Sequence, residues 1–234
     1  FMLKISKKFT SKITFIMSIY KNGNYVDYVK GKYPEPEDVL ICPTEAIDSD
    51  EIEIDSEKCI ECLLCPYRFS SEIIEYSEEN SFEKFLEFVD SDKKFTTKWI
   101  GQAITLSDNN VKCGFEVKIF GGSRSKRIPL LIMIDKKPII LKVVNSFKDI
   151  EYGLLHLEEI ESLIITNKLP VPSKVIVVNE ENSRFDNDLQ KIVTKLKETH
   201  DFDLVFIETV WNGLKNAISG NSIDWKKIFF PKNM

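Results

Sequence analysis

The sequence has few cysteines, no long apolar run and none of the common nucleotide-binding glycine motifs. Only 5 of its 234 residues are cysteine, and nothing marks the chain as secreted, which argues against a disulfide framework. No segment approaches the roughly 20 apolar residues of a transmembrane helix, so we expect no membrane partner. Neither a P-loop nor a Rossmann fingerprint occurs. We expect a cytoplasmic protein.

The composition is that of a chain with a real core and unevenly spread charge. Hydrophobic residues make up 43% of the sequence and charged residues 29%, as in ordinary globular domains. The net charge is -5, yet residues 1–84 alone carry 10 basic and 17 acidic residues. The acidic excess therefore lies in the N-terminal part. This asymmetry predicts two modules, which we place at residues 1–80 and 81–234.

Four cysteines form one pattern near the centre of the acidic part. Cys59, Cys62 and Cys65 make a C-x2-C-x2-C run, and Cys42 precedes a proline. Three thiolates in so short a loop can bind three corners of an iron–sulfur cubane, and the fourth corner must come from elsewhere. The spacing favours a 4Fe–4S cluster. A structural zinc site, which usually uses two spaced C-x2-C pairs, and unligated thiols remain as alternatives.

The residues CPTEAI from Cys42 and CIECLLC from Cys59 closely resemble bacterial-type ferredoxins. The resemblance covers residues 38–70 and implies that Cys42 is the fourth ligand, because in that family the Cys-Pro cysteine binds the cluster held by the other repeat. It further implies one cluster and not two. The ligands of a second cluster would fall on Lys32, Glu35, Asp38 and Phe69.

Periodicity predicts a different organisation after residue 80. We expect a β-hairpin over 2–33, a strand at Ile52 and Ile54, and a linker or short helix over 70–80. Further on, the expected helices are 81–89, 98–106, 147–166 and 186–199, and the expected strands are 114–120, 130–134, 139–144, 174–178 and 204–207. A basic loop fills 121–127. The order α-β-β-β-α-β-α-β implies an α+β protein with a central mixed sheet flanked by helices.

The sequence of residues 114–146 resembles the restriction-endonuclease-like or PD-(D/E)xK superfamily. The match runs through GFEV from Gly114, the GGSRSKR loop from Gly121, and the strands up to Asn145-Ser146. The resemblance implies a small ferredoxin-like domain followed by a restriction-endonuclease-like α/β domain. An unrelated α/β domain remains the alternative.

The resemblance also implies that the catalytic residues are missing. The acid expected on the second strand falls on Pro129, and the acid and lysine of the third strand fall on Lys142 and Val144. A helical glutamate falls near Gln102. We therefore name no catalytic residue and expect a scaffold that does not cleave, because a lysine repels the divalent metal that the family uses. Asp135 begins a D-x-K sequence, but in a predicted turn.

Basic residues gather over 121–142 and form a candidate nucleic-acid contact. We name Arg124, Lys126, Arg127 and Lys142, which could bind DNA or RNA phosphates. An ordinary solvated hairpin has the same appearance. The favoured function is an iron–sulfur protein whose second domain binds nucleic acid or a protein partner. The alternatives are electron transfer to a redox partner, steered by the acidic residues around the cysteines, and a nuclease that uses an atypical metal site.

Overall fold

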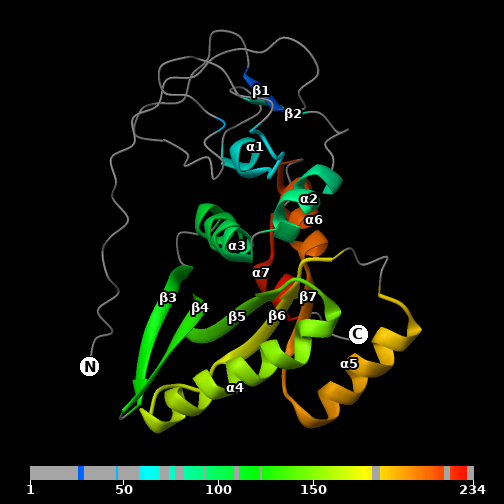
Figure 1. The fold of residues 1–234 in the computed structure, drawn as a ribbon. Coiled ribbons are helices and arrows are strands. Elements are labelled where there is room, and N and C mark those ends of the chain that lie inside the picture. Colours follow the sequence, from blue (N-terminus) through cyan, green and yellow to red (C-terminus); the bar gives the residue numbers. More distant parts are fainter. Residues whose placement is uncertain are drawn as a thin grey trace. The chain divides into compact units, whose positions relative to one another are not determined.

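The computed structural model describes residues 26–28, 46, 58–68, 74–76, 82–91, 93–107, 111–121, 123–180, 185–218 and 222–230 (Figure 1). The chain forms two compact units. The first contains residues 1–88 and 214–222, and the second contains residues 89–213 and 223–234. Helices α2 (Phe82–Ser91) and α6 (Ile207–Ile218) each contain a boundary between the units. Among the described helices, none is both long and apolar enough to cross a bilayer.

The first unit contains a two-stranded antiparallel sheet. Strand β1 (Val26–Tyr28) pairs with β2 (Ile74–Tyr76), and helix α1 (Leu64–Arg68) contacts β2. The prediction of a linker or helix over 70–80 is therefore wrong at this point. The reason is local: Ile74 and Tyr76 alternate with Glu75, which is the pattern of a half-buried strand. The predicted hairpin partner over 13–20 and the strand at Ile52 and Ile54 lie outside the described residues.

The second unit is built on a five-stranded mixed sheet. Its strands are β3 (Lys112–Gly121), β4 (Arg124–Ile134), β5 (Lys137–Val144), β6 (Ser173–Val178) and β7 (Asp203–Phe206), in that spatial order. The first three strands are antiparallel neighbours, whereas β6 and β7 run parallel to β5. The prediction of an α+β protein with a mixed sheet is confirmed.

Helices alternate with these strands in the predicted order. Helix α3 (Lys93–Ser107) precedes β3, α4 (Ile150–Thr166) connects β5 to β6, and α5 (Asn187–Thr199) connects β6 to β7. A 3-10 turn (Phe147–Asp149) leads into α4. Helices α6 and α7 (Trp225–Phe229), which follow β7, were not predicted, and neither was α1 of the first unit.

The predicted basic loop over 121–127 is wrong in most of its length. Gly121 already pairs with Arg124, and the basic residues from Arg124 onward belong to strand β4. Alternation explains this, since Ile128 is buried while Arg127 is exposed. The next turn, Asp135-Lys136, has φ values of 49° and 65°, as a two-residue hairpin of this hand requires.

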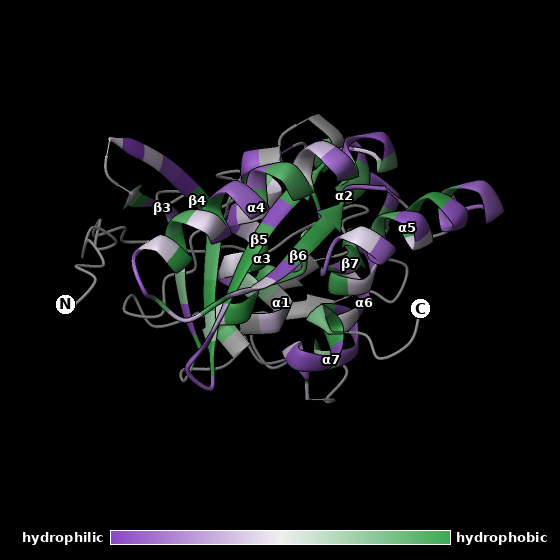
Figure 2. Ribbon diagram, turned by 90° about the horizontal axis from the view of Figure 1, so that it is seen from below, coloured by the Kyte–Doolittle hydropathy of each residue, from purple (hydrophilic) through white to green (hydrophobic). Residues whose placement is uncertain are grey.

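Helix α4 and helix α3 cover opposite faces of the sheet (Figure 1). The apolar stripe of α4 packs against strand residues of β3 to β7 in one core. The residues of this stripe are Ile150, Leu154, Leu157, Ile160 and Ile164. Figure 2 shows that β5 and β6 consist largely of hydrophobic residues, whereas much of α5 is hydrophilic. Each such buried side chain contributes about 1.5–3 kcal/mol by leaving water.

On the other face, α3 approaches the sheet very closely. Trp99, Ile100, Ala103 and Ile104 are fully buried. A Cβ on Gly101 would lie 2.3 Å from the ring of Phe115 and 3.3 Å from Leu130, so a glycine is needed for this contact. The α3 helix begins at Lys93, five residues before the predicted start at residue 98. That first turn carries residues of the site described next.

Candidate functional site

The sheet divides between β4 and β5. The ladder joining these strands runs from Ile134↔Lys137 only to Leu130↔Leu141. Beyond this point β4 remains paired with β3, while β5 remains paired with β6 as far as Val144↔Val178. We call the place where β4 and β5 separate, between Pro129 and Lys142, the fork.

A cavity of about 520 Å³ lies at the fork. Its walls come from α3, β3, β4, β5 and the beginning of α4. The lining residues are Lys94, Thr97, Lys98, Phe115, Glu116, Arg127, Pro129, Lys142, Val143, Val144, Asp149 and Tyr152. The volume is within the range of about 300–1,000 Å³ that is common for ligand pockets. The fork therefore creates a concave site out of strand residues that no longer pair.

Basic side chains outnumber acidic ones around this cavity. Its lining contains Lys94, Lys98, Arg127 and Lys142 against Glu116 and Asp149. Arg127 Nη1 lies 3.8 Å from Glu116 Oε2, but both side chains are more than half exposed, so this pair adds little to stability. The cavity has the electrostatics of an anion site and not of a divalent-cation site.

Three of the four positions that the nuclease resemblance singled out line the cavity. Pro129, Lys142 and Val144 meet there, as the resemblance implies for their counterparts. Gln102 does not line it. Its Oε1 atom is buried, and the described part of the chain provides no hydrogen-bond partner for it. One turn earlier on α3, Lys98 lines the cavity instead. Of the residues aligned to the nuclease pattern, Lys142 is therefore the one cation at the cavity, and Lys98 adds a second ammonium from α3.

Pro129 has a backbone counterpart on β3. The β3–β4 ladder pairs Phe115 with Leu130 and Val117 with Ile128. Glu116 and Pro129, which lie between these pairs, are not part of the ladder. Glu116 has a φ of 48°, which is uncommon for a residue with a side chain. A proline has no N–H to donate, so it is compatible with this gap in the ladder.

Lys142 contacts helix α4. Its Nζ lies 3.3 Å from Nδ1 of His156 and 5.6 Å from the ring centroid of Tyr152. Burial, together with the charges of Lys142 and Lys126, lowers the pKa of His156 from its ordinary value of 6.5. At neutral pH His156 is therefore uncharged, and its Nδ1 can accept a hydrogen bond from the Lys142 ammonium.

Two of the four predicted nucleic-acid contacts reach the cavity. Arg127 and Lys142 line it, while Arg124 and Lys126 do not. Lys126 forms an ion pair with Glu159 of α4, and Arg124 is exposed. Asp135 of the D-x-K sequence lies in the exposed turn beyond the far end of β4, paired with Lys226. The structure therefore does not bring Asp135 to the fork.

Several residues of the cavity were not predicted as site residues, among them Lys94, Lys98 and Tyr152. Lys94 and Lys98 lie one helical turn apart on α3, and Tyr152 lies in the first turn of α4. The spacing of the two lysines would have placed them on one helix face, had the helix been extended to residue 93. Tyr152 had no such signal, because an aromatic residue in an amphipathic helix usually belongs to the core.

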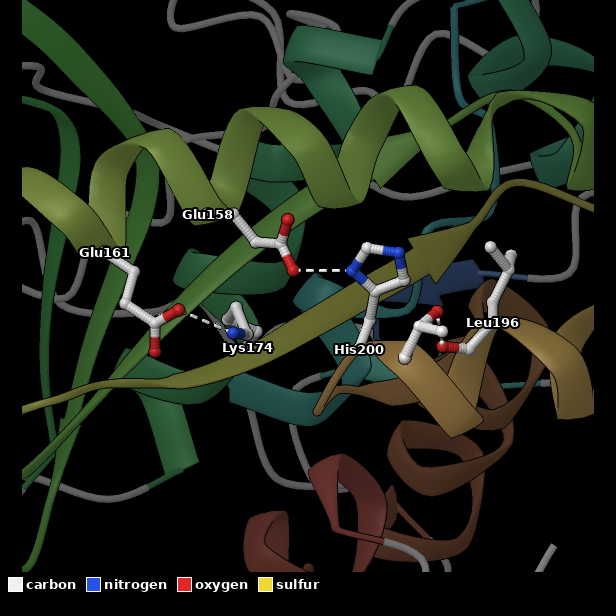
Figure 3. A network of polar contacts seen from close by, with 6 residues as sticks. Glu158, Glu161, Lys174, Leu196 and His200 are labelled. Carbon is white, nitrogen blue, oxygen red and sulfur yellow. Dashed lines mark hydrogen bonds and ion pairs between the residues drawn. The ribbon is translucent and has the colours of Figure 1, made fainter.

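An ion pair and a hydrogen-bond contact position α4 against β6 and the end of α5 (Figure 3). Lys174 Nζ donates to Glu161 Oε2 at 2.6 Å, and Glu158 Oε1 lies 2.6 Å from His200 Nδ1. Lys174 is 9% exposed and Glu161 19%. Both pairs therefore tie the middle of α4 to its neighbours.

A buried asparagine joins α3 to the end of β6. Asn179 Nδ2 donates to Thr96 Oγ1 at 3.1 Å and to the carbonyl oxygen of Val89 at 3.0 Å. Its backbone N–H donates to the carbonyl oxygen of Val144 at 2.9 Å, directly after β5. Because Thr96 and Thr97 are buried in the same turn as Lys94 and Lys98, this network holds the lysine-bearing end of α3 in place.

The cysteine loop belongs to the first unit. Cys62 is buried, Cys59 and Cys65 are half-buried, and Cys65 lies in α1. Cys42 lies outside the described residues. Among the residues that the structure describes, no three His, Cys, Asp or Glu side chains are grouped as a metal site. Three predicted ligands are thus present on one loop, and the fourth is not described.

The backbone on both sides of Cys62 is unusual. Glu61 and Leu63 have φ values of 56° and 63°, in the left-handed region that side-chain-bearing residues rarely adopt. Both residues are buried, and Glu61 Oε1 lies 3.6 Å from Lys84 Nζ. Left-handed residues are a common part of the loops whose N–H groups surround anions and iron–sulfur clusters. The thiol donor set and this backbone both fit a cluster.

Cys113 is unlike the other cysteines. It lies on β3, where burial raises the pKa of its thiol to about 11, partly offset by a hydrogen bond with Thr105. A thiol with this pKa stays protonated at neutral pH and is a poor metal ligand or nucleophile.

No protein-family model, curated protein or solved structure matches this chain. Functional conclusions must therefore come from the chemistry of the site itself.

Proposed function

We propose that residues 81–234 bind the phosphate backbone of nucleic acid at the fork without cleaving it. The single observation that carries this proposal is the position of Lys142 in the cavity, with Lys94, Lys98 and Arg127 around it. Ammonium and guanidinium groups bind phosphate oxygens and release counterions. The resemblance of residues 114–146 to the nuclease superfamily supports phosphate binding as well, because those nucleases bind a phosphodiester at the corresponding part of the sheet.

The absence of a carboxylate pair at the fork argues for binding without cleavage. Cleavage by this superfamily needs acids that hold a divalent metal and activate water. Here the corresponding side chains are Pro129, Lys142 and Val144. The two acids of the cavity come from β3 and from the turn before α4, and Glu116 is within 3.8 Å of Arg127. These two acids therefore do not resemble a pair of carboxylates that bind one metal ion.

We further propose that Cys42, Cys59, Cys62 and Cys65 hold one 4Fe–4S cluster. Support comes from the donor spacing and from the left-handed residues Glu61 and Leu63 beside Cys62. When bound, such a cluster supplies a one-electron redox centre or a structural clamp. The chain's own contribution would be the four thiolates.

The decisive experiment measures binding of a short labelled DNA and a short labelled RNA by fluorescence anisotropy over a salt series. We expect affinity to fall steeply with salt, and to fall at fixed salt in Lys98→Ala, whose side chain is exposed at the cavity. The matched control is Lys195→Ala, an exposed lysine on α5 that does not line the cavity. Incubation with Mg²⁺ or Mn²⁺ should leave the nucleic acid intact. Equal loss in both variants, or no binding at low salt, would refute the proposal.

A further inference from the structure

The cavity at the fork combines cations with exposed aromatic surface. Tyr152 is 71% exposed, although it lies on the helix that forms the core of this unit. Its ring is on the cavity wall, 5.6 Å from the Lys142 ammonium. An exposed aromatic ring next to a bound phosphate group is the arrangement with which proteins stack nucleobases.

A second aromatic side chain, Phe115, lines the cavity from β3. Its ring lies against Gly101 so closely that a Cβ there would be 2.3 Å away. The Phe115 ring therefore packs directly on α3 and lines the cavity from that side. Phe115 and Tyr152 thus supply apolar surface from two different elements, β3 and α4, in a cavity whose lining also contains lysines.

The size of the cavity limits what can enter. About 520 Å³ suits a ligand of nucleotide size and not a double helix. In duplex DNA the bases are stacked inside and cannot reach a concave pocket unless they are unpaired. A phosphate on the surface of a duplex would use the lysines but would leave Tyr152 and Phe115 without a role.

We propose that the cavity receives one unpaired nucleotide of a single-stranded nucleic acid, with its base stacked on Tyr152 and its phosphate bound by Lys98, Arg127 and Lys142. This inference rests on the proposed function and specifies its ligand. Glu116 and Asp149 also border the cavity. Their carboxylates can accept hydrogen bonds from base amino groups or sugar hydroxyls, which a phosphate cannot donate.

The test compares a labelled oligothymidylate, which cannot pair with itself, with a duplex of the same length at one salt concentration. The full chain should bind the single strand more tightly. Tyr152→Ala should weaken single-strand binding by roughly 5- to 150-fold, which corresponds to the loss of one stacked base. Tyr152→Phe keeps the ring and should bind nearly as the parent does. Because the side chain is largely exposed, these variants should fold, and thermal melting checks that they do.

The matched control is Phe120→Ala. Phe120 is also exposed, at 59%, and also has an ammonium near its ring, that of Lys118 at 4.8 Å, but it does not line the cavity. Its loss should leave single-strand affinity unchanged. If Tyr152→Ala binds as the parent does, or the duplex binds as tightly as the single strand, the inference is wrong while phosphate binding stands. If neither nucleic acid binds, the proposed function fails as well.

Discussion

Lys142 Nζ and His156 Nδ1 lie 3.3 Å apart, joining the third strand of the sheet to the second turn of α4. An ammonium is stable this close to an imidazole only if the imidazole is neutral, because two cations would repel one another. The contact therefore fixes both the protonation state of His156 and the direction of the Lys142 side chain at the fork. The first prediction follows from this pair.

The stability of the protein should decline in mild acid because of His156. Burial and nearby lysines lower its pKa in the folded protein below the ordinary 6.5, so the unfolded chain takes up the proton first as the pH falls. The contribution of neutral His156 to the free energy of unfolding is fully present above about pH 6.5. It is lost as the pH falls through the lower pKa that His156 has in the folded protein. His156→Asn, which keeps an acceptor near Lys142, should lose less stability in acid than the parent. Urea denaturation at about pH 7.5 and pH 5.5 measures the difference.

A parent and a variant that lose equal stability between those two pH values would show that His156 titrates normally. In that case the contact between Lys142 and His156 is not maintained in solution.

The second prediction concerns the cysteines. Protein purified without oxygen should contain about four iron and four sulfide per chain. Cys62→Ala should lose the cluster, because Cys62 lies between the two left-handed residues that shape the loop. Cys113→Ala is the matched control and should keep it, since its pKa of about 11 leaves the thiol protonated. Iron and sulfide analysis with absorption spectra before and after dithionite provides the readout.

Zinc in place of iron, with no sulfide, would exclude the cluster and favour the structural zinc alternative. Unchanged iron in Cys62→Ala would show that this residue is not a ligand.

The third prediction concerns the ion pair between Lys174 and Glu161. Lys174 is 9% exposed, so Glu161→Ala leaves a nearly buried ammonium without its carboxylate. The loss should lower the free energy of unfolding by about 1–3 kcal/mol. The control is Lys191→Ala, which breaks the exposed pair of Lys191 with Asp188, where the side chains are 76% and 84% exposed. That change should cost at most about 0.5 kcal/mol. Denaturant titrations of both variants and the parent make the comparison, and equal losses would contradict it.

The fourth prediction reverses one charge at the fork. Lys142→Glu should weaken nucleic-acid binding far more than Lys195→Glu, although both change the net charge by the same amount. The reason is position, since Lys142 lines the cavity and Lys195 lies on the outer side of α5. Anisotropy titrations at one salt concentration measure both. Equal weakening would mean that only the overall charge of the protein matters.

Much of the second unit could be predicted from periodicity because each element buries one side. Ile150, Leu154 and Leu157 recur at helical spacing, and all three are fully buried or nearly so. The ends of the strands were less predictable. Arg124 to Arg127 read as a loop because their charges suggest solvent, yet strand pairing with β3 depends on backbone groups and tolerates exposed basic side chains.

The candidate site was only partly predictable for a related reason. Pro129, Lys142 and Val144 could be aligned to the nuclease pattern, and the structure places them in one cavity. Lys94, Lys98 and Tyr152 come from helices, and their convergence on the fork depends on how the helices cross the sheet. No spacing rule along the sequence encodes that crossing.

The fork has a consequence for how this protein can change over evolutionary time. The backbone ladder that holds β4 to β5 ends at Leu130 and Leu141, so the side chains of Pro129 and Lys142 are not needed for the pairing of these two strands. Their chemical character can be exchanged, acid for base or polar for proline, while the architecture persists. A scaffold of this kind can lose one chemistry and acquire another through a handful of substitutions at a single place.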